Sequence, residues 1–245
     1  MAEFIEPEMV NIIHQKTQKS MTISMVHLPK GKFMFGEGSS AREVTIDYEF
    51  EIGKFPVTIK EYMTFVEDTN SHVPEWLEED SDYNINTGTD DHYQNINQDK
   101  KAPIVGISWY DAVAFCEWLS KKSGQNYRLP TEKEWEYACR AGTKTKWSFG
   151  DDEEELSKYA WYNENSYGQA HIVGEKEPNL WGLCDMHGNV WEWCEDWYDE
   201  EEKHKVLRGG SWMYNANGSR SASRNWDYPT GRDNDVGFRL LRTLP

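Results

Sequence analysis

The chain of 245 residues is long enough to bury a sizeable core, either as one large domain or as two small ones. Its formal net charge of −17 argues against nucleic-acid binding, which needs a basic surface, and against attachment to anionic membranes. No apolar run approaches the roughly 20 residues of a membrane span, and residues 1–20 lack the apolar region of a signal peptide. We therefore expect a cytoplasmic protein without membrane insertion.

Alternating patterns mark the first part of the chain. Residues 1–24 are predicted to form a polar N-terminal arm, with a helix as one option for its structure. Apolar and polar residues then alternate from 25 to 36 around a Pro-Lys-Gly turn, which predicts a β-hairpin. A second alternation from 44 to 54 predicts a strand.

Three helix starts are marked by capping signals. The segments 58–61 and 131–134 both read Thr-x-x-Glu, the spacing of a capping box, and apolar residues follow each at helical spacing. Ser108 precedes a third segment of this kind, which Gly124 ends, and Gly142 ends the helix that begins near 131. These signals predict three α-helices.

The segment 75–101, between the first two predicted helices, is rich in Asp, Asn, Thr and Gln and is predicted to be a long polar loop. Beyond residue 142, short apolar bursts between Gly and Asn predict irregular loops with short strands. The acidic runs 151–155 and 199–203 are expected to be solvated loops. Because no linker or internal repeat is visible, we expect a single α+β domain over residues 25–245.

Seven segments carry a resemblance to a known family. They are 30–36 (KGKFMFG), 56–58 (PVT), 103–112 (PIVGISWYDA), 127–138 (YRLPTEKEWEYA), 179–193 (NLWGLCDMHGNVWEW), 208–212 (RGGSW) and 234–240 (NDVGFRL). In this order they resemble the sulfatase-modifying factor family, which includes the formylglycine-generating enzymes. The resemblance spans residue 25 to the C-terminus and implies a variant of the C-type lectin fold with few regular elements and long loops.

The resemblance also indicates what this chain lacks. In active members, two cysteines after the Arg-Gly-Gly-Ser motif carry copper-dependent oxidation, and here Tyr214 and Ser219 stand at their positions. A phenol and an alcohol cannot replace the soft thiolates that copper(I) needs. The remaining cysteines lie in other motifs and are predicted to be buried free thiols: Cys116, Cys139, Cys184 and Cys194. The His-x-x-x-His-x-Glu iron motif of another branch is also missing, so we expect no copper, no iron and no catalytic residue of the known kind.

A calcium site is a further implication of the resemblance. The family segment that matches 185–192 binds calcium, and the corresponding ligands here are Asp185, the carbonyls of Gly188 and Val190, and Glu192. Such a mixed set of oxygens suits calcium. The alternative is a structural turn in which Glu192 pairs with an arginine.

The composition of 213–235 resembles the variable region of target proteins that retroelements diversify. Tyr, Ser, Gly and Asn are also typical of adaptable binding surfaces. Ordinary drift in an Asn-rich loop is the alternative, and the sequence leaves both open. The positions expected to be exposed and to bind ligand, which we call the display positions, are Tyr214, Asn215, Asn217, Ser219, Ser223, Asp227, Tyr228, Thr230, Asp233 and Asp235. The interleaved Trp212, Arg220, Arg224, Phe238 and Arg239 are expected to be buried or hydrogen-bonded.

Two functions follow from these observations. The first is a ligand-binding protein on a formylglycine-generating-enzyme-like scaffold, without oxidase activity, whose partner is an unknown protein or small molecule and not a nucleic acid. The second is a family oxidoreductase with altered chemistry that acts on a thiol or a peptide. The missing cysteine pair favours the first. A structural accessory domain for a partner enzyme is a weaker third option.

Overall fold

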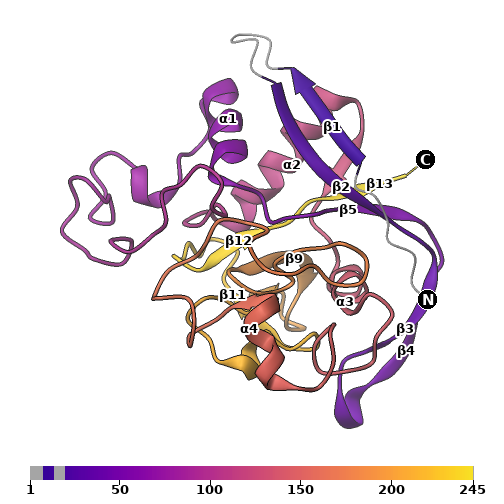
Figure 1. Cartoon of the computed structure of the whole chain (residues 1–245). Helices are drawn as coiled ribbons and strands as arrows, with labels where there is room; N and C mark the ends of the chain where they lie inside the picture. The colour runs from indigo at the N-terminus through magenta and orange to yellow at the C-terminus, as the bar shows by residue number, and fades with distance from the viewer. Residues whose placement is uncertain (1–7, 14–19, 245) are drawn as a thin grey trace.

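Two larger sheets, two two-stranded sheets and the helices packed against them make up the described chain, as the computed structural model shows for residues 8–13 and 20–244 (Figure 1). The larger sheet has the strand order β1-β2-β5-β13-β6, and every neighbouring pair in it is antiparallel. Its strands are β1 (Glu8–Ile13), β2 (Ser20–Leu28), β5 (Phe50–Gly53), β13 (Leu241–Thr243) and β6 (Asn126–Arg128). The predicted α+β single domain is confirmed.

The N-terminal residues belong to this sheet. The boundary predicted between residues 24 and 25 falls inside β2, and the described part of 1–20 contains strand β1 where a helix was one option. Both expectations are wrong for the same reason: β1 pairs along its whole length with the next strand, β2, and this pairing overrides the polar local composition.

Both faces of the larger sheet are covered. Alternate residues of β2 point to opposite faces, so Met21 and Ile23 join one core cluster while Val26 and Leu28 join another. The first cluster includes residues of α1 (Ile59–Thr69) and α2 (Trp109–Ser123), and the second includes residues of α3 (Glu132–Arg140). The sheet is therefore the central layer between α1 and α2 on one side and α3 on the other.

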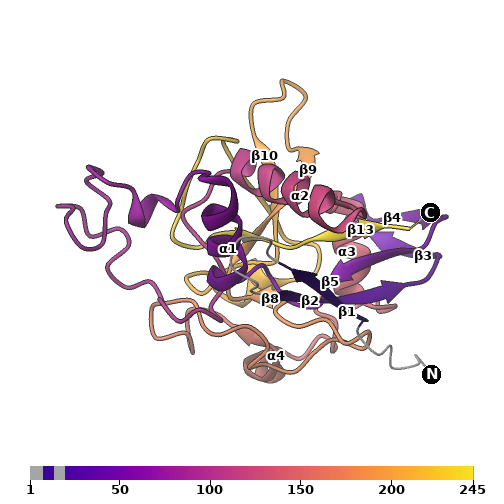
Figure 2. The ribbon, with the colours of Figure 1, turned by 90° about the horizontal axis from the view of Figure 1, so that it is seen from above.

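The predicted helix starts are confirmed. Thr58, Ser108 and Thr131 are the N-caps of α1, α2 and α3, and each forms a complete capping box. Figure 2 shows α1 and α2 side by side, and the Tyr62 and Phe115 rings stack between them with centroids 6.1 Å apart. A short fourth helix, α4 (Leu156–Tyr159), follows the acidic turn η3 (Glu153–Glu155).

A hairpin of β3 (Gly31–Phe35) and β4 (Arg42–Ile46) projects at the lower right of Figure 1. The hairpin predicted around the Pro-Lys-Gly turn is wrong, because β2 pairs with β1 and β5 whereas β3 pairs with β4. The true turn lies at 36–41 and contains η1 (Gly38–Ser40). The strand predicted over 44–54 is interrupted between β4 and β5.

The smaller sheet carries the C-terminal half, in the order β11-β10-β9-β12. Its strands are β11 (Arg224–Asp227), β10 (Lys205–Arg208), β9 (Trp191–Trp197) and β12 (Val236–Phe238). A parallel pair, β7 (Ala160–Trp161) and β8 (His187–Gly188), and the turn η4 (Ala216–Ser219) complete the elements. Strands β9 and β12 also pair in parallel, which places the predicted calcium segment against the C-terminus.

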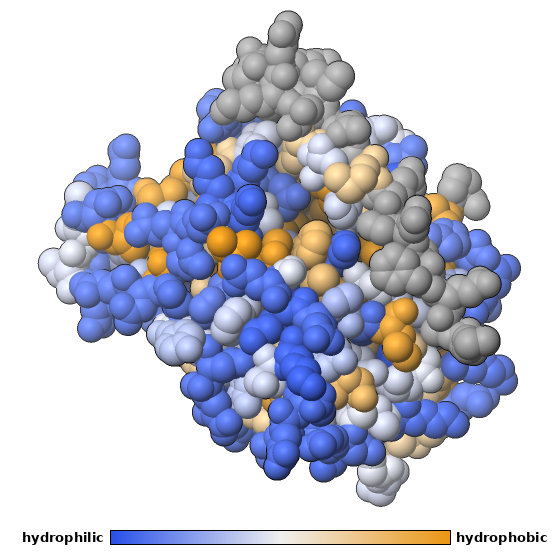
Figure 3. Space-filling view, in the orientation of Figure 1, coloured by the Kyte–Doolittle hydropathy of each residue, from blue (hydrophilic) through white to orange (hydrophobic). Residues whose placement is uncertain are grey.

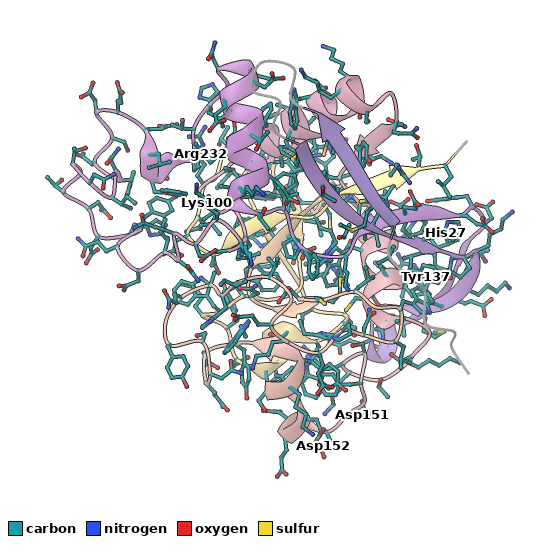
Figure 4. All side chains as sticks on the ribbon, turned by 45° about the horizontal axis from the view of Figure 1, so that its top comes forward. His27, Lys100, Tyr137, Asp151, Asp152 and Arg232 are labelled. Carbon is teal, nitrogen blue, oxygen red and sulfur yellow. The ribbon has the colours of Figure 1, made fainter. Side chains whose placement is uncertain are left out.

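The 75–101 loop is irregular as predicted, apart from η2 (Glu75–Leu77). It is nevertheless anchored, because Arg232 pairs with Glu78 of the loop and with Asp111 of α2, at 3.1 Å for the latter. Figure 4 shows Arg232 beside α1, while Asp151 and Asp152 project at the opposite end as exposed side chains.

Hydrophilic side chains cover most of the described surface that Figure 3 shows. Within the described residues, 8–13 and 20–244, no helix is both long and apolar enough to cross a membrane. The four cysteines are buried and free, as predicted.

Candidate functional site

A cleft of about 730 Å³ lies between the β3–β4 hairpin and the C-terminal segment 214–225. Hairpin residues including Phe35 and Arg42 form one wall, and the segment that includes Tyr214 forms the other. Side chains from α3, β9 and β10 form the floor. We call these three parts the hairpin wall, the rim segment (residues 214–225) and the floor.

Two glycines after Arg208 set the position of the rim segment. Gly209 and Gly210 have φ values of +102° and +81°, in the region that favours glycine. A Cβ atom on Gly210 would lie 2.8 Å from the carbonyl oxygen of Gly218, so a side chain there would clash with η4. The chain can therefore turn back over itself and place Tyr214 at the mouth of the cleft.

The floor is a network of buried ion pairs. Arg208, 1% exposed, donates to Glu136 at 2.6 Å, and Arg140 donates to the other oxygen of Glu136 at 2.8 Å. Arg224 of the rim segment, whose side chain is exposed, donates to buried Glu132 of the floor at 2.8 Å. Breaking a buried pair leaves an uncompensated charge, so these partners stabilise one another's position.

The predicted ligand-binding residues fall into three groups of exposure. Those that are exposed are Tyr214, Asn215, Asn217, Tyr228 and Thr230. Those that are partly buried are Ser223, Asp227 and Asp233. Two are buried, Ser219 and Asp235, and for these the expected exposure is wrong. Only three of the ten line the cleft: Tyr214, Asn217 and Ser223.

The two buried positions are fixed by contacts from distant segments. The carbonyl oxygen of Ser219 lies 2.7 Å from Nδ1 of His187, and a Cβ on Gly210 would lie 2.8 Å from its Oγ. Asp235 accepts a hydrogen bond of 2.5 Å from Ser211, and burial raises the pKa of its carboxyl to about 6. Asp233 does not line the cleft and contacts His92 of the 75–101 loop at 3.0 Å.

The interleaved positions match the expectation that each is buried or hydrogen-bonded. Phe238 and Arg239 are fully buried, whereas Trp212 is only partly buried, with its indole N–H 3.4 Å from the Asn234 carbonyl. Arg224 is exposed yet paired with Glu132, as described above.

The hairpin wall was missed by the sequence reasoning. Phe35 and Arg42 have no local signal of a binding role, because their place in the cleft depends on packing against residues about 180 positions later in the chain. An ion pair between Glu37 of the hairpin and Arg220 of the rim segment joins these two walls of the cleft.

The two positions that correspond to the family's cysteines differ from each other. The Tyr214 ring lies edge-on to Trp191, with centroids 5.2 Å apart and an interplanar angle of 85°. Ser219 lies beneath the surface. At the position where the resemblance implies the first cysteine, the cleft therefore presents an aromatic ring.

Cys139 and His187 form the only close Cys–His contact in the described ranges, at 3.9–4.0 Å. Burial raises the pKa of the Cys139 thiol to about 12 and lowers the pKa of His187 to about 4, so both groups are neutral near pH 7. The Ser219 carbonyl can only accept, so Nδ1 of His187 carries the proton and Nε2 accepts from the Ser148 N–H at 3.1 Å. A nucleophilic thiolate needs a lowered pKa, and this pair does not supply one.

The other thiols are also unsuited to act as thiolates. Burial raises the pKa of Cys184 to about 11, and it raises the pKa of Cys116 and of Cys194 as well. All four cysteines are therefore protonated near neutral pH.

The predicted calcium segment forms a buried turn. Both carboxylate oxygens of Glu192 accept hydrogen bonds from Arg239, at 2.8 and 2.9 Å, and one also accepts from the Trp135 indole at 2.7 Å. Asp185 accepts from the Gly174 N–H at 2.7 Å, and burial raises the pKa of its carboxyl to about 6.

The residues of this turn do not fit a calcium ion in this arrangement, because Arg239 already supplies the cation that neutralises Glu192. No group of three or more His, Cys, Asp or Glu residues is placed to hold a metal within the described part of the chain. The calcium site, with its carbonyls from Gly188 and Val190, stays a prediction, and the pairing with Arg239 favours the structural turn.

Comparison with known proteins gives this architecture its family. The Sulfatase-modifying factor enzyme 1-like domain matches residues 11–244. The chain belongs to this family. The match begins before residue 25, in agreement with the place of β1 and β2 in the sheet. The protein named Inactive C-alpha-formylglycine-generating enzyme 2 of Bos taurus is 31% identical to this family member, over 89% of this chain and 87% of its own length.

Two solved structures share the fold along nearly the whole chain. Treponema denticola variable protein 1 superposes with a TM-score of 0.77 and 26% identity, covering 97% of this chain and 99% of that one. PvdO from Pseudomonas aeruginosa superposes with a TM-score of 0.76 and 28% identity, covering 91% and 95%. The predicted family and fold are confirmed.

Proposed function

We propose that this family member is a ligand-binding protein without the oxidase activity of the active enzymes, and that its ligand enters the cleft between the hairpin wall and the rim segment. The observation that carries the proposal is the contrast inside that cleft. A volume of about 730 Å³ is kept open, which lies in the range of small-ligand sites, while Tyr214 takes the position of the first family cysteine.

The composition of the cleft supports binding. Tyr214 and Trp191 offer rigid aromatic area, and Asn217, Ser223 and Asn225 offer adaptable hydrogen bonding. The floor is held by ion pairs, so the site is preorganised, which lowers the entropic cost of binding. A relative carries the word inactive in its name and a structural neighbour is called a variable protein, and both fit this proposal.

Binding can be tested by selecting ligands from a library of short random peptides and a library of small organic compounds. We expect at least one saturable ligand whose affinity falls about tenfold or more in Tyr214→Ala/Asn217→Ala, because these side chains line the cleft. The matched control is Tyr167→Ala, since Tyr167 is 88% exposed and does not line the cleft. Ligands that bind the wild type, the double variant and the Tyr167→Ala control with equal affinity would place the binding site elsewhere and overturn the proposal.

The absence of oxidase activity has its own test. The protein, supplied with copper(I) and a sulfatase-type cysteine peptide, should yield no formylglycine by mass spectrometry, because its thiols are buried and protonated. Formylglycine that disappears in Cys139→Ser would favour the alternative, an oxidoreductase with altered chemistry.

We further propose that the rim segment is of the diversified kind. Tyr214, Asn215 and Asn217 are exposed, so substitution there should cost little stability, whereas substitution at buried Ser219 and Asp235 should cost more. A reverse-transcriptase gene beside a near-copy of the last ~100 coding bases would support diversification; the display positions alone would then differ between the two copies. A near-copy that differs mainly at codons 219 and 235 would contradict the proposed display surface.

A further inference from the structure

Two buried donors on the floor of the cleft have no hydrogen-bond acceptor among the residues that the structure describes. They are Nε1 of Trp191 and Nε of Arg208. Both side chains line the cleft and are 3% and 1% exposed. Buried N–H groups in proteins are nearly always paired, so these two donors make the floor of the cleft poor in acceptors.

The charges of the cleft favour an anionic acceptor. Its three glutamates are all neutralised: Glu37 by Arg220, Glu132 by Arg224, and Glu136 by Arg140 and Arg208. The chain as a whole carries a formal charge of −17, so a cleft whose carboxylates are neutralised differs from most of the surface.

Arg42 adds a positive charge to this balance. It lines the cleft from the hairpin wall and forms no ion pair with any residue of 8–13 or 20–244. Its guanidinium lies 4.9 Å from the centroid of the Phe35 ring and is exposed. A guanidinium in this position can donate two parallel hydrogen bonds to a carboxylate.

Three aromatic rings complete the recognition surface. Phe35, Trp191 and Tyr214 line the same cleft, and rings of this kind stack against flat apolar groups. We infer that the cleft binds an organic carboxylate with a flat apolar body, whose oxygens accept hydrogen bonds from the exposed Arg42 guanidinium. This inference rests on the proposed function, because it names the ligand class of the same cleft.

Titration of the ¹⁵N-labelled full chain with benzoate, benzamide and inorganic phosphate tests the inference by NMR. Benzoate should bind saturably and shift the indole N–H signal of Trp191, assigned with Trp191→Phe. Benzamide, which has the same ring without the charge, and phosphate, which has charge without a ring, should each bind about tenfold more weakly.

Charge variants separate a specific contact from general attraction. Arg42→Gln should weaken benzoate binding about fivefold to tenfold while the remaining spectrum stays folded. Lys121→Gln removes the same charge from the exposed end of α2 and should leave the affinity unchanged. Equal effects of the two variants would overturn the role of Arg42.

The outcomes also distinguish this inference from the proposed function. Equal binding of benzoate and benzamide, tighter binding of phosphate, or no saturable binding of benzoate would each overturn the carboxylate inference. Library ligands that are neutral and depend on Tyr214 would then leave the binding function intact. If no library ligand depends on Tyr214, the proposed function fails, and the inference fails with it.

Discussion

The floor and the rim segment of the cleft face the same space but differ in how their side chains are held. On the floor, Arg208 has two carboxylate partners and two carbonyl partners and is almost fully buried. On the rim, Tyr214 and Asn217 are exposed and depend on few contacts. A cleft of this kind can change its rim without losing its fold, because the energetic cost of substitution is concentrated beneath it.

The largest expected effect compares an arginine of the floor with an arginine of the rim segment, each replaced by methionine. Arg208→Met should lower the free energy of unfolding by about 3–5 kcal/mol, because it leaves buried Glu136 with one cation fewer and Glu132 less compensated. Arg220→Met removes a partly exposed pair and should cost at most about 1 kcal/mol. Urea melts measure both. Equal losses would contradict the division between floor and rim.

The next effect concerns two neighbouring positions that look alike in sequence. Ser219→Tyr should cost about 2–3 kcal/mol, because Ser219 is 0% exposed and a ring would have to displace packed neighbours. Asn217→Tyr should stay within about 0.5 kcal/mol because Asn217 is exposed. The same urea melts decide this, and a stable Ser219→Tyr protein would restore Ser219 to the display surface.

A pH series sharpens the comparison at Asp235. The pKa of its carboxyl is raised from 3.8 to about 6, so the folded state binds a proton more tightly than the unfolded state. Wild-type stability contributed by this group is therefore present below pH 4 and is lost as the pH rises to 6. The Asp235→Asn variant has no carboxyl to ionise at this position, so its free energy of unfolding does not fall in this way.

The stability difference between Asp235→Asn and wild type should shift in favour of the variant by about 1–2 kcal/mol between pH 4 and pH 7. Denaturant melts at both pH values measure it. Tyr228→Phe, at an exposed position outside the cleft, is the control and should show no such shift. A stability difference that does not change with pH would mean that burial does not raise the pKa of the Asp235 carboxyl.

The smallest expected effect is that of calcium. An ion at one hundred times its Kd would stabilise the fold by about 2.7 kcal/mol and raise the Tm by about 5–10 °C. Because Arg239 occupies both oxygens of Glu192, we expect no shift between excess calcium and chelator. A calcium-dependent rise in wild type that is lost in Glu192→Gln would restore the predicted site.

Short segments of the sequence were enough to predict the three long helices and the family. The three capping boxes and the helices behind them follow from side chains that lie within four residues of each N-cap, so they could be predicted from short segments. The family could likewise be identified from its motifs, and the replacement of two cysteines by Tyr214 and Ser219 was visible in the sequence alone.

Contacts between distant segments decided the rest. The pairing of Glu192 with Arg239, the burial of Ser219 under Gly210 and the hydrogen bond from Ser211 to Asp235 join residues that are 9 to 47 positions apart. No local pattern encodes them, so exposed and buried members of the display set look the same in sequence.

The sequence by itself determined the helices, the family and the loss of the thiol pair, because each depends on neighbouring residues or on residue identity. Only the tertiary structure placed the β3–β4 hairpin opposite the rim segment and left Arg42 facing the cleft. The physical reason is that a cleft is made by packing surfaces together, and the free energy that packs them is summed over the whole core rather than over any one segment.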